Sequence, residues 1–388
     1  MPILNRAAEL QQEVAEWRRH IHQNPELGYD VFETAAFVKA KLEAFGCDEV
    51  VTGLGRTGVV GVIRGRAPGA TVGLRADMDA LPIEEVSGQP YASRIPGKMH
   101  ACGHDGHTAM LLGAAKYLAE TRNFEGVVVV IFQPAEEGGG GGGAMVRDGL
   151  MERFGIDKVF GMHNMPGLPV GEFAIRPGPI MASTAEFTID IKGRGAHAAM
   201  PHLGVDPVVA GSQLVTALQT IASRSTDPID SVVVSVTKFH AGTAHNIIPE
   251  TAQIAGTVRS LRKDVAAKAE ERMKAISAGI ALATGTEIIV DYDPNYPVTF
   301  NHADETVVAG DIAASVAGET QVHRDIQPLM GGEDFSYMLE ARPGAFIFIG
   351  NGDSAGLHNA AYDFNDEAIP HGISYWVKLA ESTLGRSR

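Results

Sequence analysis

The chain has 388 residues, a length typical of two domains, and 45% of them are hydrophobic, which is ordinary for a globular protein in water. Its formal net charge of -15 disfavours nucleic acid and anionic lipid as partners. No apolar stretch approaches the roughly 20 residues of a membrane helix, and the N-terminus lacks the basic start and apolar core of a signal peptide. Only two cysteines occur, Cys47 and Cys102, so we expect a reducing, cytoplasmic setting without a disulfide framework.

Strands and helices are predicted to alternate in the first 180 residues, which indicates an α/β sheet. Apolar residues from Ala7 to Ile21 recur every three or four positions, the period of an amphipathic helix, and Pro25 ends it. The continuously apolar run Val127–Phe132 is typical of a strand with helices on both faces. The remaining predictions here are helices at Thr34–Phe45 and His107–Glu120, and strands at Val59–Ile63, Val72–Leu74 and Lys158–Met162.

The middle of the chain has a different pattern. Phe187, Ile189 and Ile191 alternate with polar residues, which predicts a strand with one solvent-facing side. The elements that follow give the order β-α-β-β-α-β of a ferredoxin-like α+β unit. They are helix Asp206–Ser223, strands Val232–Phe239 and Ala252–Arg259, helix Asp264–Thr284 and strand Glu287–Tyr292.

We place this unit at residues 181–295, as an insert in a discontinuous α/β domain of residues 1–180 and 296–388. Prolines and a glycine at 177–179, and Pro294, are the predicted hinges. The α/β pattern resumes after the insert, with helices Asp304–Val316 and His371–Ser382 and strand Ala345–Ile349.

The densest group of reactive side chains lies in residues Met99–His107, which hold three histidines, a cysteine and an aspartate. Cys102 and His104 are two residues apart in a glycine-containing loop, so both can reach one site, and thiolate and imidazole suit a metal such as zinc. The structural alternative is a polar turn that caps the following helix. Because several ligand types cluster here, the sequence favours a metal site.

Further candidates follow predicted strands, where ligands bind in open α/β sheets. Glu136 and Glu137 come after the strongest strand, and one of the pair can bind a metal while the other moves protons. His163 and His358 each follow a strand end, although either alone is equally consistent with a structural histidine. Asp77 and Asp79 are candidates to orient metal-bound histidines. The glycine run 138–143 follows Glu137 directly and precedes a helix-like segment, which argues against a flexible linker.

The insert has its own polar group. His197 lies in a loop after a strand, Asn246 between two strands, and Arg259 at the end of the next strand. An imidazole, an amide and a guanidinium are typical stabilisers of an oxyanion and a carboxylate. Polar groups of hairpin turns and a solvated arginine are the structural alternatives.

Taken together, these motifs resemble the M20 peptidase family, in the amidohydrolase branch that includes hippurate hydrolases, N-acetyldiaminopimelate deacetylases and plant auxin-conjugate hydrolases. The resemblance covers nearly the whole chain. Its motifs are Trp17–Gly28, Arg75–Pro82, the CGHDGH sequence at 102–107, Gln133–Glu137 and Met330–Phe335.

The resemblance implies a mixed-sheet, zinc-peptidase-like catalytic domain with an inserted dimerisation or lid domain, and a homodimer. It implies two divalent metal ions per chain, with five ligands: Cys102, His104, Glu137, His163 and His358. Glu136 would be the general acid/base, and Asp77, or alternatively Asp79, would support the site. His197 would reach a reaction centre, in its own chain or in the partner subunit. Zinc, manganese, nickel and cobalt all remain open, because mixed ligands do not choose between them.

The expected activity is hydrolysis of the linear amide bond of an N-acyl amino acid. Glu136 would carry the proton from water to the leaving amine, His197 would support the oxyanion, and Arg259 and Asn246 would hold the free carboxylate. A dipeptidase or aminopeptidase using the same groups, and a metal-dependent binding protein without catalysis, are the alternatives. No Gly-x-Ser-x-Gly elbow points to a nucleophilic hydrolase.

Overall fold

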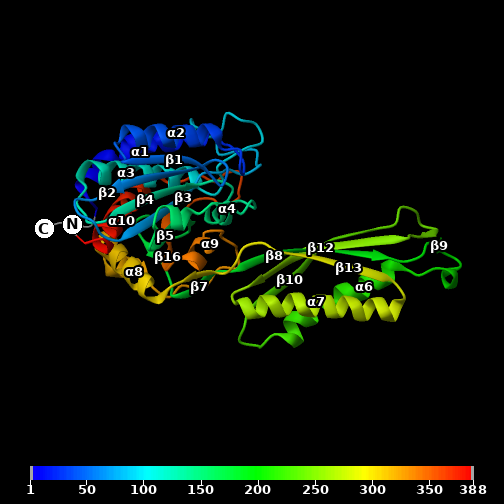
Figure 1. The fold of residues 1–388 in the computed structure, drawn as a ribbon. Helices are drawn as coiled ribbons and strands as arrows, with labels where there is room; N and C mark the ends of the chain where they lie inside the picture. Colours follow the sequence, from blue (N-terminus) through cyan, green and yellow to red (C-terminus); the bar gives the residue numbers. More distant parts are fainter. Residues whose placement is uncertain (1–2, 386–388) are drawn as a thin grey trace. The chain divides into compact units, whose positions relative to one another are not determined.

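The computed structural model describes residues 3–385, and the chain divides into two compact units (Figure 1). The first unit contains the residues up to Ile180, Phe300–Gln327, and the residues from Asp334 onward. The second contains Met181–Thr299 and Pro328–Glu333. The second unit therefore ends at Thr299 rather than 295 and includes a short later segment that the sequence did not predict. No helix in residues 3–385 is both long and apolar enough to cross a membrane.

The first unit is built on an eight-stranded mixed sheet with the order β1-β2-β4-β3-β5-β16-β6-β15. The four strands β4, β3, β5 and β16 are neighbours and run parallel. The strands are β1 (Glu49–Leu54), β2 (Gly58–Arg64), β3 (Thr71–Asp77), β4 (Val127–Gln133), β5 (Lys158–Pro166), β6 (Phe173–Ala174), β15 (Val322–His323) and β16 (Gly344–Gly352). Two further short strands, β7 (Gly178–Met181) and β14 (Thr299–Asn301), lie at the positions in the sequence where the chain passes from one unit to the other.

One large apolar core joins this sheet to its helices, and α1, α3 and α10 pack against one another in it. The predicted strand Val127–Phe132 is almost wholly buried, as expected for a strand covered on both faces. The helices are α1 (Asn5–Gln23), α2 (Phe32–Ala44), α3 (His104–Thr121), α4 (Gly141–Arg147), α5 (Leu150–Arg153), α8 (Ala303–Ala317), α9 (Ser336–Ala341) and α10 (Ile369–Thr383).

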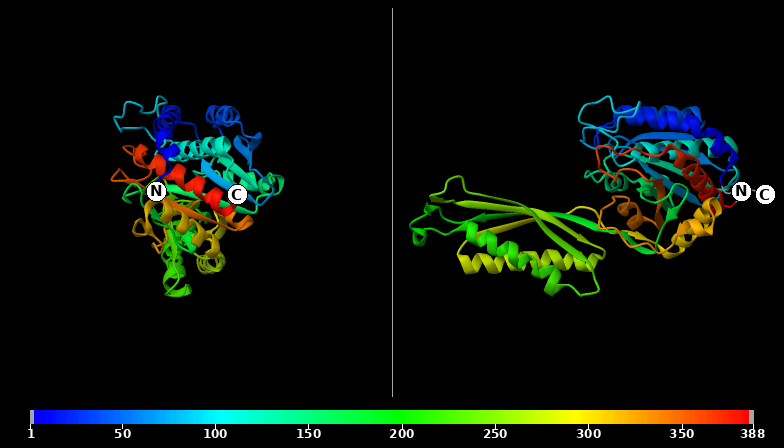
Figure 2. Two further views of the ribbon diagram at one scale, coloured as in Figure 1. Left: turned by 90° about the vertical axis from the view of Figure 1, so that its left-hand side faces the viewer. Right: turned by 180° about the vertical axis from the view of Figure 1, so that it is seen from behind.

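The second unit is a four-stranded antiparallel sheet with the order β10-β12-β8-β13, the arrangement of a ferredoxin-like fold. Its two helices lie on the same face (Figure 2) and enclose a separate apolar core. The elements are β8 (Ser183–Lys192), α6 (Pro207–Leu218), β10 (Val232–Ala241), β12 (Thr251–Ser260), α7 (Lys263–Thr284) and β13 (Glu287–Pro294). The helix predicted to reach Ser223 gives way after Leu218 to a turn of π-helix at Ile221–Ser225.

Candidate metal centre

The candidate ligands of the first unit come together at one edge of the sheet. Because β4, β3, β5 and β16 are parallel neighbours, their carboxyl ends meet there. Asp77 is the last residue of β3, Glu136 and Glu137 follow β4, and His358 follows β16. The prediction that His163 follows its strand is wrong, since β5 continues to Pro166 and His163 lies within it.

The loop before α3 carries Cys102 and ends in a close approach of backbone and side chains. Gly103 has φ +87°, and a Cβ there would lie 2.2 Å from Nδ2 of Asn164 and 2.6 Å from the hydroxyl of Tyr362. Only glycine fits this position. Helix α3 begins at His104, three residues earlier than predicted, so His104 belongs to the first helical turn rather than to a free loop.

Several sets of ligand atoms lie within 4.8 Å of one another. Among them are Cys102, His104 and His163; Cys102, Glu137 and His358; His104, Glu136 and Glu137; and Asp77, His104 and His107. Each pair of the first three sets has one residue in common, which is Cys102, His104 or Glu137. The three sets therefore form one continuous cluster. The cluster contains all five residues expected as ligands, together with Glu136.

The hydrogen bonds of two histidines leave one ring nitrogen of each for a metal. His104 Nδ1 lies 2.8 Å from the backbone oxygen of Asp79, and His163 Nδ1 lies 2.7 Å from that of Asn164. Each Nδ1 must therefore carry the proton, which leaves an electron pair on Nε2. His104 Nε2 has no hydrogen-bond partner although it is buried, and His163 Nε2 lies 3.4 Å from Cys102 Sγ.

His107, which is also close to this cluster, is suited to support rather than to ligation. Its Nδ1 lies 2.7 Å from Asp77 Oδ1, and its Nε2 accepts the backbone N–H of Asn164 at 2.9 Å. Both ring nitrogens are thus occupied. Burial lowers the pKa of His107, which keeps the ring neutral. From the sequence, His107 is only the first residue of the predicted helix and has no role in the site.

The electrostatics of the cluster favour a bound cation. Burial and the nearby carboxylates of Glu137 and Glu136 raise the pKa of the Cys102 thiol well above its usual value. Burial opposes a charge on His104, but Asp77 and Asp79 outweigh it and raise its pKa to about 10. The site therefore draws positive charge, and a divalent metal would supply it in place of protons. The donor set and the partnerless His104 Nε2 both fit a metal.

The two aspartates of β3 and its extension have different partners. Burial opposes the charge on Asp77, but His104 and Arg75 outweigh it and hold its pKa well below the usual range. Its carboxylate receives Arg75 Nη1 at 2.7 Å as well as His107. The Asp79 carboxylate instead accepts the backbone N–H groups of Glu136 at 2.9 Å and Glu137 at 3.1 Å. Asp77 orients a histidine, and Asp79 orients the glutamate pair.

The glycine run after Glu137 is part of this packing. A Cβ at Gly141 would lie 1.7 Å from the backbone oxygen of Pro134, and one at Gly142 would lie 2.7 Å from that of Asp334. The run lets α4 start directly against the end of β4. Gly142 N–H also donates to Asp334, whose carboxylate accepts from Arg75 and Gln133. This gives Asp334, in the motif Met330–Phe335, a structural role that sequence spacing alone did not reveal.

The candidate residues of the second unit lie at two separate places within it. His197 is in the two-residue strand β9 (Ala196–His197), which pairs with β11 (Ile247–Ile248), and Ala198 N–H donates to the backbone oxygen of Asn246. His197 is therefore in a short strand and not in an open loop. Its Nδ1 accepts the backbone N–H of Ala199 at 3.1 Å, which leaves Nε2–H as a donor on an exposed side chain.

Arg259 is near the opposite end of the same sheet. His197 follows Lys192, the last residue of β8, and Asn246 precedes Thr251, the first residue of β12. Lys192 and Thr251 pair at one end of the sheet, whereas Arg259 is eight positions along β12. At about 3.3 Å per residue this separates Thr251 from Arg259 by roughly 25 Å. The structure therefore does not bring Asn246 and Arg259 of one chain together at one small carboxylate.

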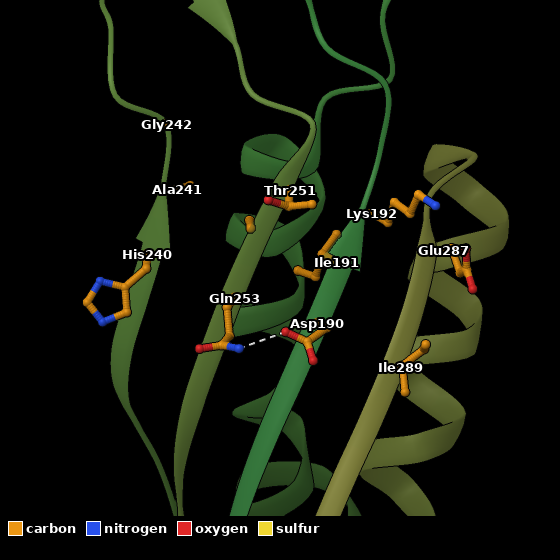
Figure 3. A pocket seen from close by; sticks show the side chains of 11 residues that line it. Asp190, Ile191, Lys192, His240, Ala241, Gly242, Thr251, Gln253, Glu287 and Ile289 are labelled. Atoms are coloured by element: carbon orange, nitrogen blue, oxygen red, sulfur yellow. Dashed lines mark hydrogen bonds between the residues drawn. The ribbon is translucent and has the colours of Figure 1, made fainter.

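The face of this sheet opposite the helices carries a shallow hollow at the Thr251 end (Figure 3). Its lining includes Asp190, Lys192 and Glu287, and Gln253 donates to Asp190 at 2.7 Å. The exposed charges have both signs and lie on an open surface. We regard the hollow as ordinary polar surface of an antiparallel sheet.

The comparisons with known proteins agree with this geometry. Residues 73–382 match Peptidase family M20/M25/M40. The chain is 44% identical to the hippurate hydrolase of Campylobacter jejuni, covering 98% of this chain and 99% of the relative. It is 42% identical to the N-acetyl-L-cysteine deacetylase of Bacillus subtilis, covering 97% and 89%. The crystal structure of a Bacillus subtilis protein, described as a dinuclear metal binding peptidase from the M20 family, superposes with a TM-score of 0.85 at 35% identity, covering 97% and 99%. The chain belongs to peptidase family M20/M25/M40.

Proposed function

We propose that this chain hydrolyses the amide bond of N-acyl amino acids, releasing a carboxylic acid and a free amino acid, with two divalent metal ions bound per chain. The observation that carries the proposal is the cluster of the buried residues Cys102, His104 and His163 with the partly buried Glu137 and the exposed His358, beside Glu136. A cluster of this composition suits hydrolysis assisted by two metals.

The relatives support the choice of substrate class. Hippurate and N-acetyl-L-cysteine, which two of them are named for, are both amino acids with an acylated nitrogen. The solved Bacillus subtilis relative is described as binding two metals. Similarity over nearly the full length of each chain supports the same chemistry here, without choosing the acyl group, the amino acid or the metal.

The proposed roles follow from the surroundings of each residue. Cys102, His104, Glu137, His163 and His358 would hold the metals, which when bound would polarise the scissile carbonyl and favour deprotonation of water. Glu136 would accept the proton of the attacking water and pass it to the leaving amine. Asp79 keeps Glu136 in place through its backbone N–H, and Asp77 keeps His107 in place.

The second unit would supply the groups that bind the substrate. His197 presents an Nε2–H donor, which suits an oxyanion, and Arg259 and Asn246 would bind polar groups of the substrate. Because Asn246 and Arg259 lie at opposite ends of the sheet, a small substrate could meet both only if two chains contribute. We therefore propose a homodimer formed through the second unit. The presence of only two cysteines in the sequence supports the separate proposal of a cytoplasmic setting.

A substrate panel tests the proposal. Hippurate, N-acetyl amino acids and dipeptides would each be incubated with protein first stripped by a chelator and then loaded with manganese or zinc. Release of free amino acid from the N-acyl compounds, lost on chelation and restored by metal, is expected. Cleavage of dipeptides alone would favour a peptidase, and absence of any cleavage by metal-loaded protein would favour a binding protein.

A further inference from the structure

The sequence motif Trp17–Gly28 contributes no residue to the cluster of candidate ligands, and it lies before the residues that match the family, 73–382. In the structure, most of it forms the second half of α1. Arg18 and His22 are four residues apart and therefore share one face of the helix. Both side chains are fully buried, which is unusual for a basic residue without a specific partner.

His22 contacts the residue that follows a candidate ligand. Its Nδ1 lies 2.9 Å from Asp105 Oδ2, and Asp105 is the neighbour of His104 in the first turn of α3. Its Nε2 lies 3.2 Å from Glu85 Oε1, in the loop that follows β3. Both carboxylates accept hydrogen bonds, so each ring nitrogen of His22 donates one.

Arg18 connects two segments that carry candidate ligands. Its Nη1 lies 3.4 Å from Asp105 Oδ2 and 3.0 Å from Asp363 Oδ1, and its Nε donates to Asp366 Oδ1 at 2.9 Å. Asp363 and Asp366 belong to the segment that follows His358. One buried guanidinium therefore joins the start of α3 to the segment after β16.

We propose that Arg18 and His22 are positioning residues, which hold the segments of Cys102, His104 and His358 in a ligand-competent arrangement through Asp105, Asp363 and Asp366. The inference rests on the proposed function, because it assumes that these segments bind metal. Neither residue belongs to the cluster of candidate ligands itself. Their effect should therefore appear as metal affinity, because unanchored ligands must be ordered when the metal binds.

The contact with Asp105 carries the argument, and it can be separated from the contact with Glu85. An asparagine amide nitrogen takes the place of histidine Nδ1, and a glutamine amide nitrogen takes the place of Nε2. His22→Asn therefore keeps a donor to Asp105 and loses the one to Glu85. His22→Gln does the reverse, with the same loss of ring volume and aromatic character.

The test is the zinc affinity of each purified full-length variant, measured by competition with a chromophoric chelator at fixed pH. We expect His22→Gln to raise the dissociation constant by about tenfold or more, the effect typical of lost support for a metal ligand. His22→Asn should stay within about threefold of the wild type. His20→Gln, an exposed position on the same helix, is the matched control and should leave the affinity unchanged.

Asp105→Ala provides a second route to the same answer if His22→Gln does not fold. It leaves His22 and Arg18 in place and removes the carboxylate oxygen that both contact, so it should weaken zinc binding as His22→Gln does. Equal zinc affinities for His22→Asn and His22→Gln, or wild-type affinity in Asp105→Ala, would overturn this inference alone. A wild-type protein that binds neither zinc nor manganese would overturn the proposed function as well.

Discussion

Glu136 and Glu137 are adjacent in sequence, but of the two only Glu137 belongs to the set of ligand atoms that includes Cys102 and His358. Glu137 Oε1 lies 3.3 Å from His358 Nε2 and 3.9 Å from His104 Nε2, in the middle of the ligand cluster. The backbone of both residues is held by one carboxylate, that of Asp79. We therefore propose that Glu137 binds the metals and that Glu136 moves protons.

We expect Glu136→Gln to abolish turnover while the metal content stays near that of the wild type, because the amide keeps the shape but cannot accept the proton. Single-turnover activity and metal content, measured on the same sample, check this. Cys102→Ala serves as the comparison and should lose metal first and activity with it. Loss of metal from Glu136→Gln would instead place Glu136 among the ligands.

His22 also predicts a pH dependence for the metal-free protein. Burial opposes its charge, but the charge of Asp105 and the hydrogen bonds to Asp105 and Glu85 outweigh it and raise its pKa to about 9. The titratable and charged groups that face it are Asp105, Glu85, Arg18, His100 and Tyr91. Because the folded state binds this proton more tightly, its contribution is complete below about pH 6.5 and is lost as pH rises through 9.

The free energy of unfolding of the wild type should therefore exceed that of His22→Asn by more at pH 6 than at pH 9.5. The difference between the two proteins should change by at most on the order of 3 kcal/mol over this range. Denaturant titrations of both metal-free proteins across this range measure the difference, in which other titrating groups largely cancel. A difference that is constant with pH, or that grows as pH rises, would show that His22 is not protonated in the folded state.

Among the elements, α4 depends on glycine in a way that its helical propensity does not explain. Gly141→Ala would bring a Cβ to 1.7 Å from the backbone oxygen of Pro134, so the end of β4 and the start of α4 would have to move apart. We expect a loss of several kcal/mol in stability, together with weaker metal binding, because the displaced segment carries Glu136 and Glu137.

Gly279→Ala is the contrasting control for this element. It lies inside α7, where an added Cβ meets nothing within 4 Å, so it should be neutral or stabilising by up to about 1 kcal/mol. Chemical denaturation of both variants checks the pair. A Gly141→Ala protein as stable as the wild type would mean that the run is a flexible linker after all.

Periodicity predicted the long elements because burial on one face or on both leaves a pattern in the residues themselves. It could not predict where α3 begins or that β5 continues past His163, since these boundaries depend on Gly103 fitting between Asn164 and Tyr362 and on pairing with β16. The two-residue strands β6 and β15 carry no pattern at all. Likewise, the alternation of Asp77 and Asp79 gave two equivalent candidates, and only their partners separate the two roles.

At the scale of the whole molecule, the second unit has an edge that suits association. Strand β10 has ten residues and lies at the margin of its sheet, with β12 as its neighbour there. Val233 and Phe239 on β10, and Val209 on the adjacent helix α6, are exposed. A long exposed edge strand with apolar side chains is typical of a surface that a second chain covers.

We expect a homodimer at micromolar concentration, measured by light scattering with size exclusion. Val209→Asp should shift the equilibrium toward the monomer, because it places a charge beside the edge, while the circular dichroism spectrum stays unchanged. A wild-type protein that is monomeric at these concentrations would contradict the prediction.

His197 can act in the site of its own chain or in that of a partner chain. His197 and Asn246 lie at one end of the sheet of the second unit and Arg259 near the other. If all three contact one small substrate, some must come from a partner chain. His197→Ala should then lower kcat by on the order of a hundredfold, as for loss of an oxyanion donor, with little change in stability because the side chain is exposed.

Mixing of two inactive variants tests whether His197 acts in the site of its own chain or in that of its partner. A His197→Ala chain and a Glu136→Gln chain are each expected to be inactive alone. If His197 serves its partner's site, a mixed dimer has one site with Glu136 from the first chain and His197 from the second, and activity should return toward half of the wild-type value per dimer. If His197 serves its own chain, each site of the mixed dimer still lacks one group, so no activity should return even when heterodimers are shown by mass spectrometry.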